Sequence, residues 1–372
     1  MPNTRSTNRL KPSLFRVIDI TYRLFWFFRT YYVCPRYFLD VLFSRLHDFG
    51  FRGCTSVEQS LIGGCAHLLN FSGSDTLSAA YYAQFHLNGG LPVATSIPAT
   101  EHSVMTAYVS EIEAIRAVID RFGTGVFACV MDSYDYVAAL EKILPVVAQQ
   151  KLAKGGFMVL RPDSGDPADM VLMGLRAAEK VFGTELNSKG FKVLKGCSVI
   201  QGDGVSYSVI CSLLTLIQDA GFSAENVAFG MGGGLLQKVH RDTLSFATKL
   251  SYVKYANGDV KQVMKIPQTD KAKISMPGEL DVYRDEQSRP TTFPRDQPPP
   301  TESPSLLQVV YDHGPLPNYT WDTFAQIRAR ANREWAAAPT HHNAISTLLQ
   351  QKTATVLDGL RKGLVECNAE NR

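Results

Sequence analysis

Four short apolar runs in the middle of the chain alternate with stretches of helical periodicity. Each run is the length of a buried strand and leads into glycine or a charged residue. The runs start at Val126, Phe157, Cys197 and Asn226. The amphipathic stretches cover residues 134–149, 166–182 and 205–220. This alternation predicts a parallel α/β fold whose strands deliver their last residues to one edge, as in a βα-barrel.

The residues before these runs show weaker patterns. Residues 46–53 are expected to form a polar loop. Residues 70–76 are expected to turn, with Asp75 or Thr76 capping the next helix. One continuous helix is expected from about residue 104 to residue 122.

The last third of the chain changes character. Residues 251–255 and 260–266 alternate like antiparallel strands. Residues 289–305 contain six prolines and are expected to form an extended linker. Two helices are expected after it, the first over residues 321–335. The patterns predict three parts: an atypical N-terminal segment (residues 1–43), a βα-barrel-like domain (44–248) and the C-terminal part of a second, α+β domain (249–372).

Composition and charge narrow the class of protein. The chain has 372 residues, 45% of them apolar, and a formal net charge of +3, which indicates neither nucleic acid nor a membrane surface as a partner. No uncharged run in residues 14–43 approaches the roughly 18 residues that a membrane helix needs. The first sixteen residues are basic and free of acids, a pattern that resembles a transit peptide only loosely. The seven cysteines form no CxxC pair, so we expect reduced thiols and a cytoplasmic protein.

Charged residues follow the predicted strands and would gather at one edge of the sheet. Asp132, Asp163 and Asp203 each come just after a strand. A single aspartate there is usually a helix cap, but three in succession suggest a hydroxyl-rich, Mg²⁺-associated ligand such as a ribose phosphate. Arg161 and Arg241 carry guanidinium groups suited to phosphate, although an isolated arginine more often forms a surface salt bridge.

Two further features lie on the same predicted edge. Glycines 232–234 come between a buried strand and a helix, where backbone N–H groups can hold a phosphate. His102 follows Glu101 at the start of a predicted helix. A histidine in that place more often caps or packs, but its position beside the aspartates makes it a candidate site residue.

Six motifs follow one another along residues 46–238. They are LHDFGFRG from Leu46, PATEHS from Pro98, DSYD from Asp132, LRPDSG from Leu160, IQGDGV from Ile200 and AFGMGGGLLQK from Ala228. In order and spacing they resemble the nicotinamide phosphoribosyltransferases, which are type II phosphoribosyltransferases. The resemblance implies transfer of phosphoribosyl from phosphoribosyl pyrophosphate to nicotinamide in NAD salvage, giving nicotinamide mononucleotide and pyrophosphate with Mg²⁺. It also implies a homodimer with active sites at the subunit interface, and a histidine that ATP phosphorylates to improve the yield.

The resemblance implies roles for individual residues. Phe49 would stack on the pyridine ring, and Asp75 would accept a hydrogen bond from the carboxamide nitrogen. His102 would be the histidine that ATP phosphorylates. Arg52 and Arg161 would hold pyrophosphate.

The remaining residues implied by the resemblance would bind the sugar phosphate. Asp163, Gly202 and Asp203 would hold the ribose hydroxyls, while Gly233 and Arg241 would hold the 5′-phosphate. Two supporting residues complete the set, Asp132 and Lys249. The predicted catalytic residues are His102, Arg161 and Asp163, and no protein ligand to a metal is predicted.

The chain departs from the resembled enzymes in two ways. They have well over a hundred residues before the Leu46 motif, and that segment supplies a tyrosine to the nicotinamide site across the dimer. With about 45 residues there, we expect weak activity and unpaired strand edges at residues 251–266. Met231 also stands where the resembled enzymes commonly have a small polar residue.

Two alternatives remain open. One is a nicotinate phosphoribosyltransferase, which Asp75 disfavours because its carboxylate would repel the carboxylate of nicotinate. The other is a truncated paralogue that binds nucleotide without turnover.

Overall fold

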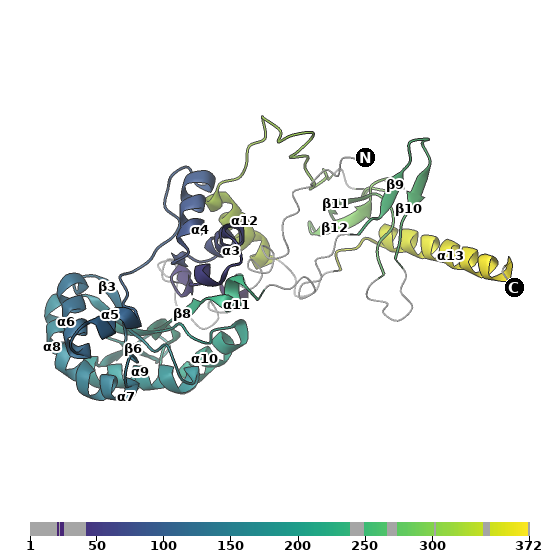
Figure 1. The fold of residues 1–372 in the computed structure, drawn as a ribbon. Helices are drawn as coiled ribbons and strands as arrows, with labels where there is room; N and C mark the ends of the chain where they lie inside the picture. The colour runs from purple at the N-terminus through teal and green to yellow at the C-terminus, as the bar shows by residue number, and fades with distance from the viewer. Residues whose placement is uncertain are drawn as a thin grey trace. The chain divides into compact units, whose positions relative to one another are not determined.

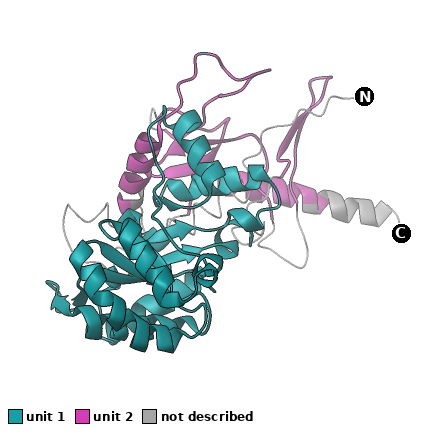
Figure 2. Ribbon diagram, turned by 60° about the vertical axis from the view of Figure 1, so that its left-hand side comes forward, with its two compact units in different colours: residues 1–246 teal, residues 247–372 magenta. Residues whose placement is uncertain are grey.

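The structure, a computed structural model, consists of two compact units, residues 1–246 and 247–372 (Figure 2). It describes residues 21, 23–25, 42–238, 249–265, 274–300, 303–337 and 343–370. Arg241 and nearly all of the predicted N-terminal segment, residues 1–43, lie outside the described residues. Within the described parts, no helix is both long enough and apolar enough to cross a membrane.

A six-stranded parallel sheet with the order β2-β1-β8-β7-β4-β3 forms the centre of the first unit (Figure 1). The strands are β1 (Leu46–Asp48), β2 (Gly73–Ser74), β3 (Val126–Val130), β4 (Phe157–Arg161), β7 (Cys197–Gln201) and β8 (Val227–Met231). The four predicted apolar runs are β3, β4, β7 and β8. The prediction of a parallel α/β fold is confirmed.

Helices cover the outside of this sheet, with α6, α8, α9 and α10 around its strands (Figure 1). Among the described residues 46–238, the α-helices are α3 (Val57–Leu68), α4 (Leu77–Tyr82), α5 (His102–Ala107), α6 (Glu111–Phe122), α7 (Tyr136–Ala138), α8 (Leu144–Lys154), α9 (Pro167–Phe182), α10 (Tyr207–Asp219) and α11 (Gly233–Leu236). Side-chain oxygens of Ser56, Ser110, Asp166 and Ser206 cap α3, α6, α9 and α10. Pro167 follows the Asp166 cap as the first helical residue, as predicted.

Shorter elements complete the unit. The π-helical segments η2 (Ala83–Leu87) and η3 (Ala139–Ile143) continue α4 and α7, and the 3₁₀ turns are η1 (Phe51–Gly53) and η4 (Ala224–Asn226). Strands β5 (Thr184–Leu186) and β6 (Lys192–Leu194) form a small antiparallel hairpin.

The two faces of the sheet belong to two separate cores. Alternate strand residues such as Phe127, Leu160 and Phe229 pack with the helices in the larger core. The residues between them form a smaller core on the opposite face: Ala128, Val159, Ile200 and Ala228, with Phe49, Ile97 and Phe157 packed against them. Side chains therefore fill the inside of the curled sheet.

Residues 95–100 link the two edges of the sheet. At the first edge, the N–H of Ser74 donates to the carbonyl of Thr95 at 3.0 Å. At the other edge, the Ala128 N–H donates to the carbonyl of Pro98 at 2.9 Å, and the Thr100 N–H donates to the carbonyl of Ala128 at 3.0 Å. The curled sheet and this segment together enclose the smaller core, in the manner of a barrel.

Three predictions for the first unit are wrong. Residues 70–76 are not all turn, because Gly73–Ser74 forms β2, and neither Asp75 nor Thr76 caps α4 with its side chain. Residues 46–48 are not loop: they form β1, which pairs with both β2 and β8, because burial of Leu46 outweighs the two polar residues beside it. The expected helix over residues 104–122 is two helices, α5 and α6. Ser110 starts the second by accepting a hydrogen bond from the N–H of Glu113 at 3.3 Å, and Val109 before it is 95% exposed.

The described part of the second unit contains two antiparallel hairpins and two helices. Strands β9 (Tyr252–Lys254) and β10 (Val260–Gln262) pair as predicted, and β11 (Leu280–Arg284) pairs with β12 (Pro290–Pro294). The helices are α12 (Phe324–Ala337) and α13 (Thr347–Glu370). The predicted linker over residues 289–305 is therefore wrong for its first part. Prolines fit β12 because they stand at its two ends, where a missing N–H disturbs the ladder least.

Candidate functional site

The candidate site lies where strands of the central sheet end. Most predicted site residues end a strand or follow one by at most two residues: Phe49 after β1, Asp75 after β2, Asp132 after β3, Arg161 at the end of β4 and Asp163 after it, Gly202 and Asp203 after β7, and Gly233 after β8. Because parallel strands end at one edge, these residues reach the same rim. His102 reaches it from residues 95–100, which pair beside β3.

One side of the site, which we call the acid–arginine wall, consists of His102, Asp132, Arg161 and Asp163. His102 Nε2 lies 3.4 Å from Asp163 Oδ2 and 3.9 Å from Asp132 Oδ1. Its Nδ1 lies 3.2 Å from the hydroxyl of Ser133. The imidazole is thus oriented by two carboxylates on one nitrogen and by a hydroxyl on the other, the arrangement that prepares a histidine for nucleophilic or proton-transfer chemistry.

Asp132 supports this wall from beneath, since its side chain is only 4% exposed. Its Oδ2 accepts hydrogen bonds from the N–H of Asp163 at 3.0 Å and from the hydroxyl of Ser164 at 2.5 Å. Its Oδ1 has no hydrogen-bond partner among the described residues and lies toward His102. Asp132 therefore fixes the backbone at Asp163 and keeps one oxygen free for an imidazole proton.

Arg161 and Asp163 form a close ion pair. Arg161 Nη2 and Nε lie 2.9 and 3.3 Å from Asp163 Oδ1, and Nη2 lies 3.9 Å from Glu101 Oε1. The arginine side chain is 15% exposed. A guanidinium has five N–H donors, so an orientation fixed by Asp163 leaves donors for a phosphate oxygen.

The opposite side, which we call the phenylalanine wall, consists of Asp48, Phe49 and Asp75. The Phe49 N–H donates to the carbonyl of Met231 at 3.1 Å. The guanidinium carbon of Arg161 lies 5.9 Å from the centre of the Phe49 ring, so the two walls meet there. A Cβ at Gly230 would lie 2.0 Å from the ring, which means that the ring occupies space that only glycine leaves open.

Asp48 and Asp75 carry the acidic groups of the phenylalanine wall. Asp75 is exposed, and its Oδ1 accepts from the hydroxyl of Ser96 at 2.5 Å. Asp48 is fully buried, and burial raises the pKa of its carboxyl to about 6. The Asp75 N–H donates to the backbone carbonyl of Asp48 at 2.9 Å, which ties the two strand ends together.

The other predicted site residues are placed differently. Arg52 on η1 and Asp203 after β7 are exposed, and the Asp203 carbonyl accepts from Gln201 Nε2 at 2.7 Å. A Cβ at Gly202 would lie about equally far from Asp163, Arg161 and Phe49, at 3.5 to 3.6 Å, so Gly202 lies where the two walls meet. Gly233 is the first residue of α11. Lys249 belongs to the second unit.

Sequence reasoning missed several residues of the site. Ser133 and Ser164 directly follow Asp132 and Asp163, so a search for hydroxyls next to the strand-end aspartates finds them. Ser96 bonds Asp75 across 21 residues of chain and carries no local signal. Gly230 was not singled out either, although it lies in the AFGMGGG motif.

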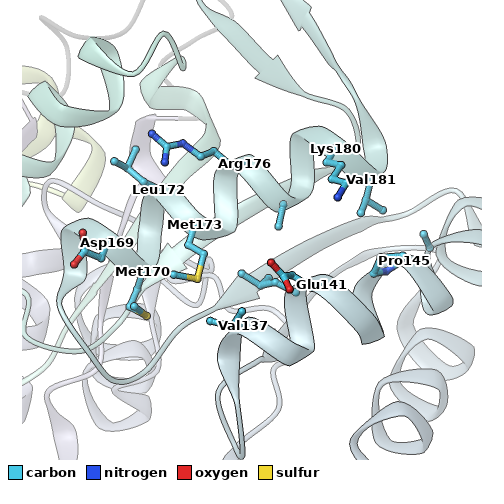
Figure 3. A pocket seen from close by; sticks show the side chains of 13 residues that line it. Val137, Glu141, Pro145, Asp169, Met170, Leu172, Met173, Arg176, Lys180 and Val181 are labelled. Carbon is cyan, nitrogen blue, oxygen red and sulfur yellow. The ribbon is translucent and has the colours of Figure 1, made fainter.

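A groove of about 710 Å³ lies away from this site, between η3–α8 and α9 (Figure 3). Met170 and Met173 of α9 project toward the side that carries Val137 and Glu141. The groove is lined by none of the predicted site residues. Among the described residues, no group of three or more histidine, cysteine, aspartate or glutamate side chains could hold a metal ion.

Comparisons with known proteins agree with this geometry. The sequence profile of the nicotinate phosphoribosyltransferase (NAPRTase) family matches residues 44–296. A nicotinamide phosphoribosyltransferase of Xanthomonas campestris pv. campestris is 42% identical over 297 residues, which cover 77% of this chain and 62% of that protein. One from Mycoplasma pneumoniae is 35% identical over 251 residues, covering 63% of this chain and 53% of that protein.

Comparison with solved structures supports the α/β fold. The crystal structure of human nicotinic acid phosphoribosyltransferase superposes with a TM-score of 0.50 and 16% identity, over 92% of this chain and 74% of the human one. At that identity the likeness concerns the fold alone. The chain spans between about half and three fifths of the length of the two bacterial relatives.

Proposed function

The chain belongs to the nicotinate phosphoribosyltransferase family, and we propose that it transfers phosphoribosyl from phosphoribosyl pyrophosphate to nicotinamide in NAD salvage. One observation carries the proposal. The Arg161 guanidinium contacts the Asp163 carboxylate at 2.9 Å and lies 5.9 Å from the centre of the Phe49 ring, so an aromatic base and a pyrophosphate would bind side by side. The bacterial relatives named as nicotinamide phosphoribosyltransferases support the choice of substrates.

The proposed reaction exchanges one bond at C1′ of the ribose. The C1′–O bond to pyrophosphate breaks, and pyrophosphate leaves with the electron pair. The pyridine nitrogen donates its lone pair to C1′, so the product carries the positive charge on the pyridinium ring and no proton moves. Arg161, with the exposed Arg52 of η1, would neutralise the leaving group, and the Asp163 carboxylate would stabilise positive charge on the ribose.

Sugar and phosphate would be held on the neighbouring strand ends. Gly202 and Asp203 after β7 would receive the ribose hydroxyls together with Asp163. Gly233, at the start of α11, would donate its N–H to the 5′-phosphate. Arg241 and Lys249 remain proposed contributors from the sequence resemblance.

The phenylalanine wall would select the base. Phe49 would stack on the pyridine ring, and the exposed Asp75 carboxylate would accept from the carboxamide N–H₂. Nicotinate lacks that donor and carries a negative charge, so Asp75 disfavours a nicotinate phosphoribosyltransferase.

His102 would accept a phosphoryl group from ATP. With its Nε2–H directed at Asp163 and Asp132, the imidazole presents the Nδ1 lone pair beside Ser133. An N–P bond would form there while the bond to ADP breaks, and the carboxylates would take up the charge of the imidazolium. The phosphohistidine would lie next to Arg161, where it can couple ATP hydrolysis to binding of the pyrophosphate substrate.

Three partners complete the proposal. Mg²⁺ would bind mainly through the substrate pyrophosphate and would supply positive charge to the leaving group. A second copy of the chain would form a homodimer, for which the exposed apolar side chains of α4 and η2 offer a surface: Leu77, Tyr81 and Phe85. The buried free thiols Cys129 and Cys197 fit a reducing, cytoplasmic compartment.

A substrate assay tests the proposal. The purified chain is incubated with phosphoribosyl pyrophosphate, Mg²⁺ and either nicotinamide or nicotinate, with and without ATP. We expect nicotinamide mononucleotide as the main product, and a preference for nicotinate would replace the proposal with the alternative. Binding of nicotinamide mononucleotide without turnover of either base would identify a non-catalytic paralogue.

The role of His102 has its own test. His102→Ala should abolish the stimulation by ATP while some ATP-independent transfer remains. ATP stimulation that persists unchanged in this variant would refute the phosphohistidine.

A further inference from the structure

Asp48 makes two contacts that join the parts of the phenylalanine wall. Its Oδ1 accepts the N–H of Gly50 at 2.8 Å, just beyond Phe49. Its backbone carbonyl accepts the N–H of Asp75 at 2.9 Å. A single residue at the end of β1 thereby holds the turn that carries Phe49 and the strand end that carries Asp75.

The second carboxylate oxygen of Asp48 is not satisfied. Among the described residues Oδ2 accepts no hydrogen bond of good geometry, although the Thr76 hydroxyl lies close enough to favour the charged carboxylate. Gly64 leaves the space for them, since a Cβ there would lie 3.2 Å from Asp48 Oδ2 and 3.4 Å from Thr76 Cγ2. A buried carboxylate with an unpaired oxygen lowers the stability of a fold, so the contribution of Asp48 to packing does not account for it.

The raised pKa of the Asp48 carboxyl also indicates that its surroundings disfavour the charged form. Burial raises the pKa of its carboxyl to about 6, and the negative charge of Asp75 raises it further in the same direction. The Gly50 N–H and the nearby Thr76 hydroxyl offset the rise only in part. The carboxyl thus stays charged at neutral pH against the preference of its surroundings.

We infer that Asp48 is a positioning residue for the base: its side chain fixes the Phe49–Gly50 peptide and so seats the Phe49 ring against Gly230. The inference rests on the proposed function for the identity of the base. The acceptor oxygen is the part that matters, because the Gly50 N–H needs a partner whether or not the carboxyl is charged. The contact to Asp75 uses the backbone carbonyl and survives any side-chain substitution.

Two substitutions of Asp48 separate the effect of the acceptor oxygen from the effect of the negative charge. Asp48→Leu keeps the branching at Cγ but removes the acceptor, whereas Asp48→Asn keeps an acceptor oxygen and can donate its amide to Thr76. For Asp48→Leu we expect the KM for nicotinamide to rise about tenfold, the effect of losing one charge-assisted hydrogen bond, with kcat changed less than about twofold. Asp48→Asn should stay within about twofold of the parent chain in both constants. Glu225→Gln is the matched control, since burial also raises the pKa of Glu225 but it lies at the opposite end of β8.

Amide hydrogen exchange gives a readout that needs no turnover. In Asp48→Leu, the Gly50 N–H should exchange at least about tenfold faster while the Asp75 N–H keeps its protection. If Asp48→Leu does not accumulate as folded protein, Asp48→Ala takes its place, because a methyl group offers no acceptor to the Gly50 N–H.

The outcomes distinguish the inference from the proposed function. Three results would overturn the positioning role. The first is unchanged exchange of the Gly50 N–H in Asp48→Leu, and the second is a fall in kcat as large as the rise in KM in that variant. The third is a KM for Asp48→Asn as high as that for Asp48→Leu. A parent chain that transfers phosphoribosyl to neither base, with Gly50 exchange responding as expected, overturns the proposed function and supports the positioning of Phe49.

Discussion

The two walls of the site are held in place by different means. In the acid–arginine wall, contacts of 2.9 to 3.9 Å link all four side chains, and Asp163 contacts both His102 and Arg161. In the phenylalanine wall, the ring depends on one side-chain acceptor and on the space left by one glycine. Shared contacts make the first wall a network, whereas the second relies on single contacts. Substitutions in the first wall should therefore act on the reaction, and substitutions in the second on the choice and affinity of the base.

The largest effect is expected from Arg161→Lys in the acid–arginine wall. An ammonium group cannot keep the contact to Asp163 and bind phosphate with a planar fork at the same time. We expect kcat/KM for phosphoribosyl pyrophosphate to fall about a hundredfold. Steady-state kinetics check this, with Arg176→Lys in the outer groove as the control. A fall of less than about threefold would show that the fork of Arg161 is not used.

Gly230→Ala tests how closely the phenylalanine wall is packed. Its new Cβ would lie 2.0 Å from the Phe49 ring, so the ring has to leave its seat. We expect the KM for nicotinamide to rise up to about tenfold, the value of one lost aromatic stacking contact. Gly125→Ala is the control, because its Cβ would meet only a carbonyl oxygen at 3.8 Å. An unchanged KM would mean that Phe49 does not contact the base.

Asp75→Asn tests how the phenylalanine wall selects the base. The amide removes the charge that repels nicotinate but keeps an acceptor for nicotinamide. We expect the ratio of kcat/KM for nicotinamide over nicotinate to fall roughly fivefold, mostly through better use of nicotinate. Competition between the two bases measures this ratio directly, and Asp120→Asn on the exposed face of α6 serves as the control. A ratio that stays the same would assign the selection to another group.

Asp48→Asn should have the smallest effect on catalysis and a measurable effect on stability. The folded-state pKa of about 6 lies above the ordinary value of 3.8, so the folded protein binds more protons between these values. The parent chain therefore loses stability as the pH rises from about 4 to 6, and the loss is complete above 6. Asp48→Asn lacks this titration, so relative to the parent it should gain on the order of 2–3 kcal/mol between pH 4.5 and pH 8. Urea unfolding midpoints at the two pH values check the gain, and a constant difference would contradict it.

The comparison of the walls also explains what the sequence could reveal. Asp132 and Asp163 follow long apolar runs, so their place at the rim could be read from the chain. The strand before Phe49 has only three residues, of which Leu46 alone is apolar, and no periodicity marks so short a segment. It becomes a strand because it pairs on both sides, which is a tertiary effect. Asp48 was consequently assigned to a loop, although it is fully buried.

Other errors have the same origin. The break between α5 and α6 depends on a serine cap inside an otherwise helical pattern. Because residues 289–305 are rich in proline, the sequence did not predict β12, whose interior residues Thr291 and Phe293 are buried. The roles of individual site residues came from resemblance to a family, since spacing alone distinguishes a helix cap from a ligand-binding aspartate poorly.

The order of strands in the central sheet sets when the site can form during synthesis. Strand β1 pairs with β8, and register matches Leu46 with Phe229, so the two walls join only when segments about 180 residues apart in the chain meet. Such distant pairing makes folding slow, because a long loop has to close before the contact contributes. When only the first 200 residues have left the ribosome, His102, Asp132 and Arg161 are present. Strand β8, whose Gly230 packs against the Phe49 ring, is still missing. The proposed pocket for the base would therefore form last, once β8 has emerged.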